Sequence, residues 1–157
     1  MDKLWAPWRI KYITQKKKKG CIFCQIHNKK QDNKNFVIFR AKYCLAVLNI
    51  FPYNNGHTLL VPNRHIKTLE ALTDQELIDI NKSLIRMKKI LKKTLRPAGF
   101  NIGINIGKVS GAGIDNHIHF HIVPRWLGDT NFMPITASTK IISQSLKELH
   151  KQLTKNI

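Results

Sequence analysis

Residues 117–123 read His117-Ile118-His119-Phe120-His121-Ile122-Val123, and Pro124 follows. This alternation of histidine with apolar residues predicts a β-strand, because successive strand side chains point to opposite faces. The three histidines then share one face, and the apolar residues can pack on a helix behind it. Two chemistries use such a row: imidazoles that bind a catalytic metal, or a neutral imidazole that attacks an electrophile while its neighbours hold the tautomer and the leaving group.

The segments around this strand predict an α+β domain with a mainly antiparallel sheet. β-Branched and aromatic runs predict further strands at residues 36–40, 43–49, 57–61 and 100–106. The capping box Thr73-Asp74-Gln75-Glu76 opens a long helix, which Pro97-Ala98-Gly99 ends, and apolar spacing predicts a second helix over residues 138–153. We therefore expect about five strands and two main helices in a single domain spanning residues 1–157.

The segment before the histidine strand has an unusual composition. Phe100, Ile102, Ile104 and Ile106 alternate with Asn101, Gly103, Asn105 and Gly107. A strand with one bulky face and one face of glycine and asparagine suits the close approach of a ligand or of another chain. The Gly/Asn face is thus a second candidate functional surface.

The pair Cys21-Ile22-Phe23-Cys24 indicates metal or redox chemistry, since this spacing in a reducing compartment seldom marks a structural disulfide. Two thiolates need two further ligands for a closed tetrahedral site, and seven histidines are available. The residues alone do not choose among them. Cys44 lies in an apolar run and is expected in the core.

The formal net charge of +18 predicts a strong positive field that concentrates anionic ligands, such as nucleotides or nucleic acid. Solvated surface lysine explains much of this charge equally well. No segment approaches the roughly 18 apolar residues of a membrane span, and the N-terminus lacks a signal-peptide pattern. We therefore expect a cytoplasmic protein without a membrane partner.

Several motifs together resemble the histidine triad family of nucleotide hydrolases and transferases. Besides the histidine row they are Cys21-Ile22-Phe23-Cys24, Asn49, Gly56-His57-Thr58-Leu59-Leu60-Val61-Pro62, Arg64-His65-Ile66 and Pro124-Arg125. Three more segments are most similar to the bacterial diadenosine tetraphosphate phosphorylase branch: Trp5-Ala6-Pro7-Trp8-Arg9, residues 105–114 and Pro124-Arg125-Trp126. The resemblance implies a small α+β domain that forms a homodimer, with an arm at residues 1–20, a core at 21–126 and a C-terminal extension with a helix at 127–157.

The resemblance also implies roles for individual residues. His119 would attack the α-phosphorus and become a nucleotidyl-histidine, while His121 and His57 would hydrogen-bond around the phosphates and the leaving group. Asn49 matches the ribose-binding position of the family. Phosphate would be cradled by Asn105 and by the loop Ser110-Gly111-Ala112-Gly113. The implied cofactor is a structural Zn²⁺, bound by Cys21, Cys24, His65 and His117.

One departure from the family pattern bears on whether the nucleotidyl group is passed to water or to inorganic phosphate. Many histidine triad hydrolases have a glutamine four residues before the first histidine, where this chain has Gly113, and residues 108–116 contain no glutamine. The missing side chain favours transfer to inorganic phosphate over transfer to water. The expected function is therefore cleavage of adenine dinucleotides such as diadenosine tetraphosphate, mainly by phosphorolysis.

Three alternatives remain open at the level of sequence. One is a nucleoside phosphoramidase or dinucleoside polyphosphate hydrolase of the same family. Another is a nucleotide- or RNA-binding module without catalysis, in which Trp5, Trp8 and Trp126 stack on bases amid the basic residues. The third is a metallohydrolase that uses the histidine row as ligands.

Overall fold

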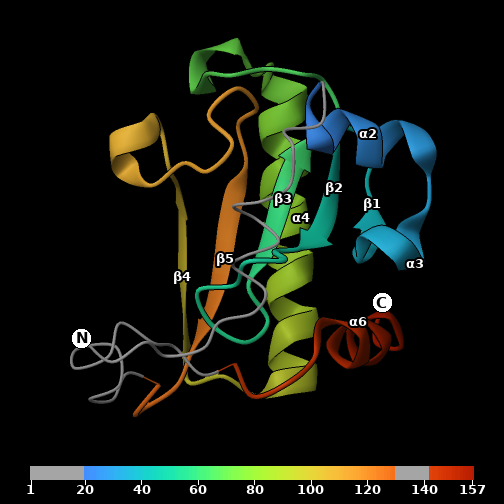
Figure 1. Cartoon of the computed structure of the whole chain (residues 1–157), viewed down its shortest axis with the longest axis vertical. Helices are drawn as coiled ribbons and strands as arrows, with labels where there is room; N and C mark the ends of the chain where they lie inside the picture. Colours follow the sequence, from blue (N-terminus) through green and yellow to red (C-terminus); the bar gives the residue numbers. More distant parts are fainter. Residues whose placement is uncertain (1–19, 130–141) are drawn as a thin grey trace, which may run out of the picture.

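The computed structural model describes residues 20–129 and 142–157, and its centre is a five-stranded sheet (Figure 1). The strands lie in the order β1-β2-β3-β5-β4, and every neighbouring pair is antiparallel. Their bounds are β1 (Val37–Arg40), β2 (Cys44–Leu48), β3 (Thr58–Pro62), β4 (Gly99–Ile104) and β5 (Phe120–Arg125). The predicted antiparallel α+β fold is confirmed.

Helices cover both faces of the sheet. The 22-residue α4 (Asp74–Leu95) runs along one face, and α6 (Leu146–Thr154) packs beside it against β1 (Figure 1). On the opposite face, Phe23 of α2 (Ile22–Lys29) packs on β1, β2 and β3. Within the described residues, the remaining helices are α3 (Asp32–Asn35) and two 3₁₀ turns, η1 (Leu69–Ala71) and η2 (Lys108–Ser110). The sequence did not predict α2 or α3, which are short and have no side-chain cap.

The histidine row lies at the start of β5, and the expected alternation is present. Ile118, Phe120 and Ile122 belong to the buried cluster beneath α4, so the histidines face away from that helix. The strand begins at Phe120, later than the predicted His117, because Ile118 N–H bonds to the Ile66 carbonyl beyond the end of β3. It also continues past Pro124. β3 pairs with β5 only as far as Ile122, so this proline has a strand on one side only.

The capping box of α4 forms as predicted. The Thr73 hydroxyl accepts from Glu76 N–H at 3.3 Å, and the Glu76 carboxylate accepts from Thr73 N–H at 2.9 Å. The same carboxylate accepts two hydrogen bonds from Arg64, at 2.7 and 2.6 Å. This ion pair ties the loop after β3 to the start of α4. The helix ends at a left-handed Arg96, whereas Gly99 already opens β4.

The C-terminal helix is shorter than predicted. It begins at Leu146, because the Ser145 hydroxyl caps the helix by accepting from Glu148 N–H. Residues 142–145 are not helical, and residues 138–141 lie outside the described chain, as do Trp5 and Trp8 of the expected arm. The division into arm, core and extension stays a prediction. None of the helices in the described segments has the length and apolar character needed to cross a membrane.

Gly56 is needed for the turn that leads into β3. Its φ is +77°, and an added Cβ would lie 2.6 Å from Leu95 Cδ1 and 3.0 Å from Pro124 Cγ. We expect Gly56→Ala to lower the free energy of unfolding by about 2 kcal/mol or more, through backbone strain and overpacking. Urea unfolding measures this loss. Gly99→Ala is the control, because an added Cβ there meets no atom within 4 Å and should change the free energy by less than about 1 kcal/mol.

The Glu76 carboxylate makes stability depend on pH. Hydrogen bonds from Arg64 and Thr73 lower its pKa from 4.5 to about 2. As the pH falls, the unfolded chain is protonated here first, so this contribution is complete above about pH 4.5 and lost towards about pH 2. Glu76→Gln should therefore lose less stability than the wild type between about pH 6 and about pH 3, measured by urea unfolding. The exposed Glu70→Gln should behave as the wild type; equal acid sensitivity in Glu76→Gln would contradict the assignment.

Candidate active site

Four histidines meet on the face of the sheet opposite α4. His117 and His119 lie just before β5 and His121 lies on it, while His57 immediately precedes β3, which pairs with β5. Their exposed fractions are 1% for His57, 1% for His117, 6% for His119 and 7% for His121. Burial disfavours the imidazolium ion, so these rings are arranged to function as neutral imidazoles.

The protonation of His119 follows from one hydrogen bond. Its Nδ1 lies 2.9 Å from the His117 carbonyl, which can only accept, so Nδ1 carries the hydrogen. Nε2 therefore keeps its lone pair. Burial lowers the pKa of His119, and the lone pair thus remains free near neutral pH. A neutral imidazole with one bare, oriented nitrogen can act as a nucleophile.

The protonation of His121 is fixed through His57. Tyr53 N–H donates to His57 Nδ1 at 2.9 Å, so the hydrogen of His57 lies on Nε2 and is donated to His121 Nδ1 at 2.8 Å. The hydrogen of His121 is therefore on Nε2, which is buried and has no partner within residues 20–129 and 142–157. Burial lowers the pKa of His57 to about 3 and that of His121 to about 4. His121 thus presents a neutral N–H donor.

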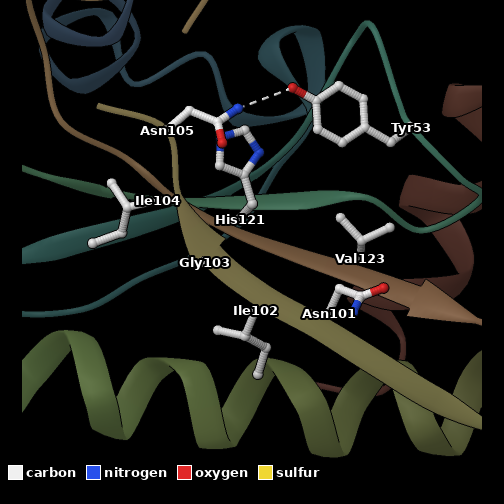
Figure 2. A pocket seen from close by; sticks show the side chains of 8 residues that line it. All are labelled: Tyr53, Asn101, Ile102, Gly103, Ile104, Asn105, His121 and Val123. Carbon is white, nitrogen blue, oxygen red and sulfur yellow. Dashed lines mark hydrogen bonds between the residues drawn. The ribbon is translucent and has the colours of Figure 1, made fainter. Parts of the chain in front are cut away.

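Tyr53, which the sequence did not single out, forms one wall of the site. Its ring stacks on His121 with centroids 5.7 Å apart and planes 6° apart, and its hydroxyl accepts from Asn105 Nδ2 at 3.2 Å (Figure 2). A cavity of about 220 Å³ lies between these groups and β4. The sequence marked Tyr53 only by its place in the turn before His57. Because turn residues are often selected for the local conformation of the turn, this position did not identify Tyr53 as a site residue.

Two expected substrate-binding side chains have local partners. The Asn49 side-chain oxygen Oδ1 accepts from Phe51 N–H at 2.9 Å, and its side-chain nitrogen Nδ2 lies 3.3 Å from His57 Nδ1. The Ser110 hydroxyl donates to carbonyls of its own loop, Ile106 at 2.8 Å and Gly107 at 2.7 Å. Asn49 therefore lies beside the histidines, whereas the Ser110 side chain shapes the loop before them.

Arg125 is engaged on two sides of its guanidinium group. Nε and one terminal nitrogen donate to Asp129 at 2.6 and 2.9 Å, and the other terminal nitrogen donates to the Asn101 side-chain oxygen Oδ1 at 2.6 Å. Asp129 also accepts from the buried Asn54 at 2.7 Å. This network joins the end of β5 to β4 and to the turn that carries Tyr53, so Arg125 acts as a structural clamp.

A second cluster contains the CxxC pair. One ligand atom each from Cys21, Cys24, His65 and His117 lies within 4.8 Å of all the others, so these four side chains can hold a metal ion. The cysteines come from the start of α2, His65 from the loop after β3, and His117 from the segment before β5. The structure thus brings together the ligand set that the family resemblance implied.

Several ligand separations in this cluster fit zinc. Cys21 Sγ lies 3.2 Å from His117 Nδ1, Cys24 Sγ lies 3.3 Å from His65 Nδ1, and the two Nδ1 atoms are 3.3 Å apart. Tetrahedral zinc, with Zn–S near 2.3 Å and Zn–N near 2.0–2.1 Å, holds its ligands roughly 3.3–3.8 Å apart. His117 Nε2 donates to the Pro62 carbonyl at 3.0 Å, which leaves the Nδ1 lone pair for the metal.

Known proteins are similar to this chain in sequence. The HIT domain family matches residues 30–126 of the chain. A Mycobacterium tuberculosis protein named AP-4-A phosphorylase is 35% identical over 162 residues, which cover 98% of this chain and 83% of that protein. The adenosine 5′-monophosphoramidase of Saccharomyces cerevisiae is 30% identical over 134 residues, 85% of this chain and 80% of the relative.

Solved structures agree with this relationship. A Zn-bound histidine triad family protein from Mycobacterium smegmatis superposes with a TM-score of 0.70 at 26% identity, covering 87% of this chain and 92% of that one. The HIT match spans well over half of the 157 residues and includes the whole histidine row. The chain therefore belongs to the HIT, or histidine triad, family, as a nucleotide hydrolase or transferase.

Proposed function

We propose that this enzyme cleaves diadenosine polyphosphates at the α-phosphate through a nucleotidyl-histidine on His119, and that it passes the nucleotidyl group to inorganic phosphate in preference to water. The observation that carries this proposal is the pairing of two fixed tautomers. His119 has a bare Nε2, and the neighbouring His121, whose ring centroid is 4.9 Å away, has a hydrogen on Nε2 that finds no partner in the described part of the chain. One nitrogen attacks and the other supports the departing oxygen.

In the first step, His119 Nε2 forms a bond to the α-phosphorus and the P–O bond to the polyphosphate breaks. The leaving oxygen keeps the electron pair and receives a hydrogen bond from His121 Nε2–H. No proton needs to be transferred, because a polyphosphate anion is a stable leaving group and because burial lowers the pKa of His121 to about 4, which keeps this ring neutral. For diadenosine tetraphosphate the departing product is ATP.

In the second step, an acceptor oxygen attacks the phosphorus from the side that the leaving group vacated. The P–N bond breaks and its electrons return to His119 Nε2, while Nδ1 keeps its hydrogen on the His117 carbonyl. Phosphate as acceptor releases ADP, and water releases AMP. Splitting one displacement into two makes the acceptor the determinant of the reaction type.

The geometry supports a changed role for His57. Both of its ring nitrogens are engaged within the protein, by Tyr53 N–H and by His121 Nδ1, and the side chain is buried. We assign it as a positioning residue that holds the tautomer of His121, in place of the direct phosphate contact that the family resemblance implied. Asn49, next to His57, remains our candidate for the ribose hydroxyls.

Phosphate binding by Asn105 and the loop 110–113 is supported by their place before the histidine row. Ser110 bonds to its own loop, so backbone N–H groups of Gly111, Ala112 and Gly113 are the stronger candidate donors. Gly111 has a φ of +89°, a conformation that brings successive N–H groups towards one side. This loop would hold the phosphate that reacts with His119.

Two observations favour phosphate as the acceptor. Gly113 replaces the glutamine that many family hydrolases carry, and the relative at 35% identity is named a phosphorylase. The relative at 30% identity is named a phosphoramidase, which keeps hydrolysis of nucleoside phosphoramidates as the second candidate. A pure nucleotide- or RNA-binding module would not require the two complementary tautomers.

We further propose that Cys21, Cys24, His65 and His117 bind a structural Zn²⁺. Four protein ligands close the coordination sphere, so such a metal supplies cross-linking without a site for water. It would join α2, the loop after β3 and the segment that leads into β5. This arrangement argues against the metallohydrolase alternative, because His119 and His121 stay outside the ligand set.

A homodimer and a cytoplasmic location remain part of the proposal. β4 is one of the two edge strands of the sheet, and Ile102 on it is 49% exposed. An edge strand with an exposed apolar side chain suits pairing with a second copy of the chain. The high positive charge would help to attract the polyphosphate substrate.

The covalent step is tested with His119→Ala. Protein quenched in alkali after incubation with diadenosine tetraphosphate, labelled at the α-phosphates, should carry acid-labile label in the wild type. The variant should carry none and should lose at least about a thousandfold in turnover. Adding phosphate should discharge the wild-type label as ADP. Turnover retained in His119→Ala would refute the mechanism, and release of AMP alone would refute phosphate as the acceptor.

The zinc site is tested by metal analysis and thermal unfolding. We expect one zinc per chain in the wild type and little in Cys24→Ser or His65→Ala, with melting temperatures lower by several degrees or more. A chelator should destabilise the wild type without an immediate loss of turnover. Cys44→Ala, at a buried cysteine outside the cluster, should keep its zinc. Inhibition by chelator at once, in still-folded protein, would point to a catalytic metal instead.

A further inference from the structure

Gly103 occupies the middle of β4 without a conformational reason for glycine. It is not among the residues with positive φ, and an added Cβ would meet no atom within 4 Å. Glycine in a strand interior weakens the strand and often marks a close approach by a ligand or another backbone. Gly103 is paired directly with His121 on β5. A side chain here would project over the histidine face, into the cavity shown in Figure 2.

This cavity has the size and lining of a small anion site. Its volume of about 220 Å³ falls below the roughly 300–1,000 Å³ typical of pockets for larger organic ligands. Tyr53, Asn101, Asn105 and His121 supply its polar groups, and the residues that line it include no carboxylate. His121 is more than nine-tenths buried, and its Nε2 has no partner in the described part of the chain.

The polar groups of the cavity are arranged as donors. Arg125 donates to the side-chain oxygen Oδ1 of Asn101 at 2.6 Å, which leaves the NH₂ group of the same side chain for a ligand. Asn105 donates to the Tyr53 hydroxyl at 3.2 Å, which leaves the hydroxyl hydrogen. The His121 Nε2–H completes the set. Several donors, with no carboxylate among the lining residues, match the acceptor oxygens of a phosphate group.

We infer that this cavity, which we call the acceptor subsite, binds the inorganic phosphate that takes the nucleotidyl group from His119. In the preceding step, the same subsite holds the polyphosphate leaving group. The inference rests on the proposed function. Departure and attack occur on the same side of the phosphorus, opposite His119, so one site must serve both groups. The cavity borders His121, the ring that supports the departing oxygen, and Gly103 keeps it open.

The chemistry at the subsite balances without another reactant. An unprotonated oxygen of hydrogen phosphate bonds to the phosphorus of the nucleotidyl-histidine, and the P–N electrons return to His119 Nε2. The bound phosphate keeps its own proton and becomes the β-phosphate of a nucleoside diphosphate. Water needs no such cavity, so the acceptor subsite would decide between phosphorolysis and hydrolysis.

The test fills the cavity and compares two substrates. Gly103→Val places a side chain in the subsite, while Gly99→Val makes the same change on the same strand, where an added Cβ also has open space, outside the lining residues. Adenosine 5′-phosphoramidate, once protonated on its nitrogen by solvent, loads the enzyme with release of ammonia and needs no room for a polyphosphate. Diadenosine tetraphosphate needs that room. Label on the protein and the ADP to AMP ratio are measured against the concentration of inorganic phosphate.

We expect Gly103→Val to load normally from the phosphoramidate but to require at least about tenfold more phosphate for ADP formation, so that AMP predominates. Loading from diadenosine tetraphosphate should slow by a similar factor, and Gly99→Val should match the wild type. Asn101→Asp provides a second variant, because its carboxylate repels phosphate without filling the cavity. An unchanged phosphate dependence in Gly103→Val or, should that variant misfold, in Asn101→Asp overturns the subsite. Absence of label in the wild type with both substrates instead overturns the proposed function.

Discussion

The hydrogen bond from His119 Nδ1 to the His117 carbonyl is the contact on which the rest of the site depends. It fixes the hydrogen of His119 on one nitrogen and leaves the other bare. The same His117 contributes its ring to the Cys/His cluster and is held from behind by the Pro62 carbonyl. Backbone and side chain of one residue therefore serve two sites. Anything that displaces His117 therefore disturbs both the Cys/His cluster and the hydrogen bond that orients His119.

The second constraint is the series of hydrogen bonds that runs from Tyr53 N–H through His57 to His121. Buried polar groups need partners, and leaving one unpaired costs about 1–3 kcal/mol. Within the described residues, every donor of this series has an acceptor except the last, His121 Nε2–H, on the ring beside His119. A ligand that supplies an acceptor to this buried N–H gains most there. Burial also keeps the His57 and His121 rings neutral, so this series holds the His121 N–H in a fixed orientation and does not take up a proton.

Local patterns predicted the framework well because each depended on near neighbours in the chain. The capping box at Thr73 and Glu76 and the alternation around Phe120 are local devices, and both are present. Element ends were less accurate. β5 starts three residues late because Ile118 bonds to the loop after β3, and α6 starts at Leu146 because Ser145 provides the cap. Such ends depend on partners that the hydrophobic pattern does not encode.

The sequence by itself determined the chemistry available to this protein: three histidines on one strand face, a cysteine pair with metal spacing, and a strand face of glycine and asparagine. Residue type and period-two geometry suffice for that much. The tertiary structure decided which atoms are available for this chemistry. Tautomers depend on partners far apart in the chain, such as His57 and His121, and the open space over Gly103 exists only where β4 and β5 pair beside Tyr53. Hydrogen-bond direction and empty volume arise from packing, and no local pattern records them.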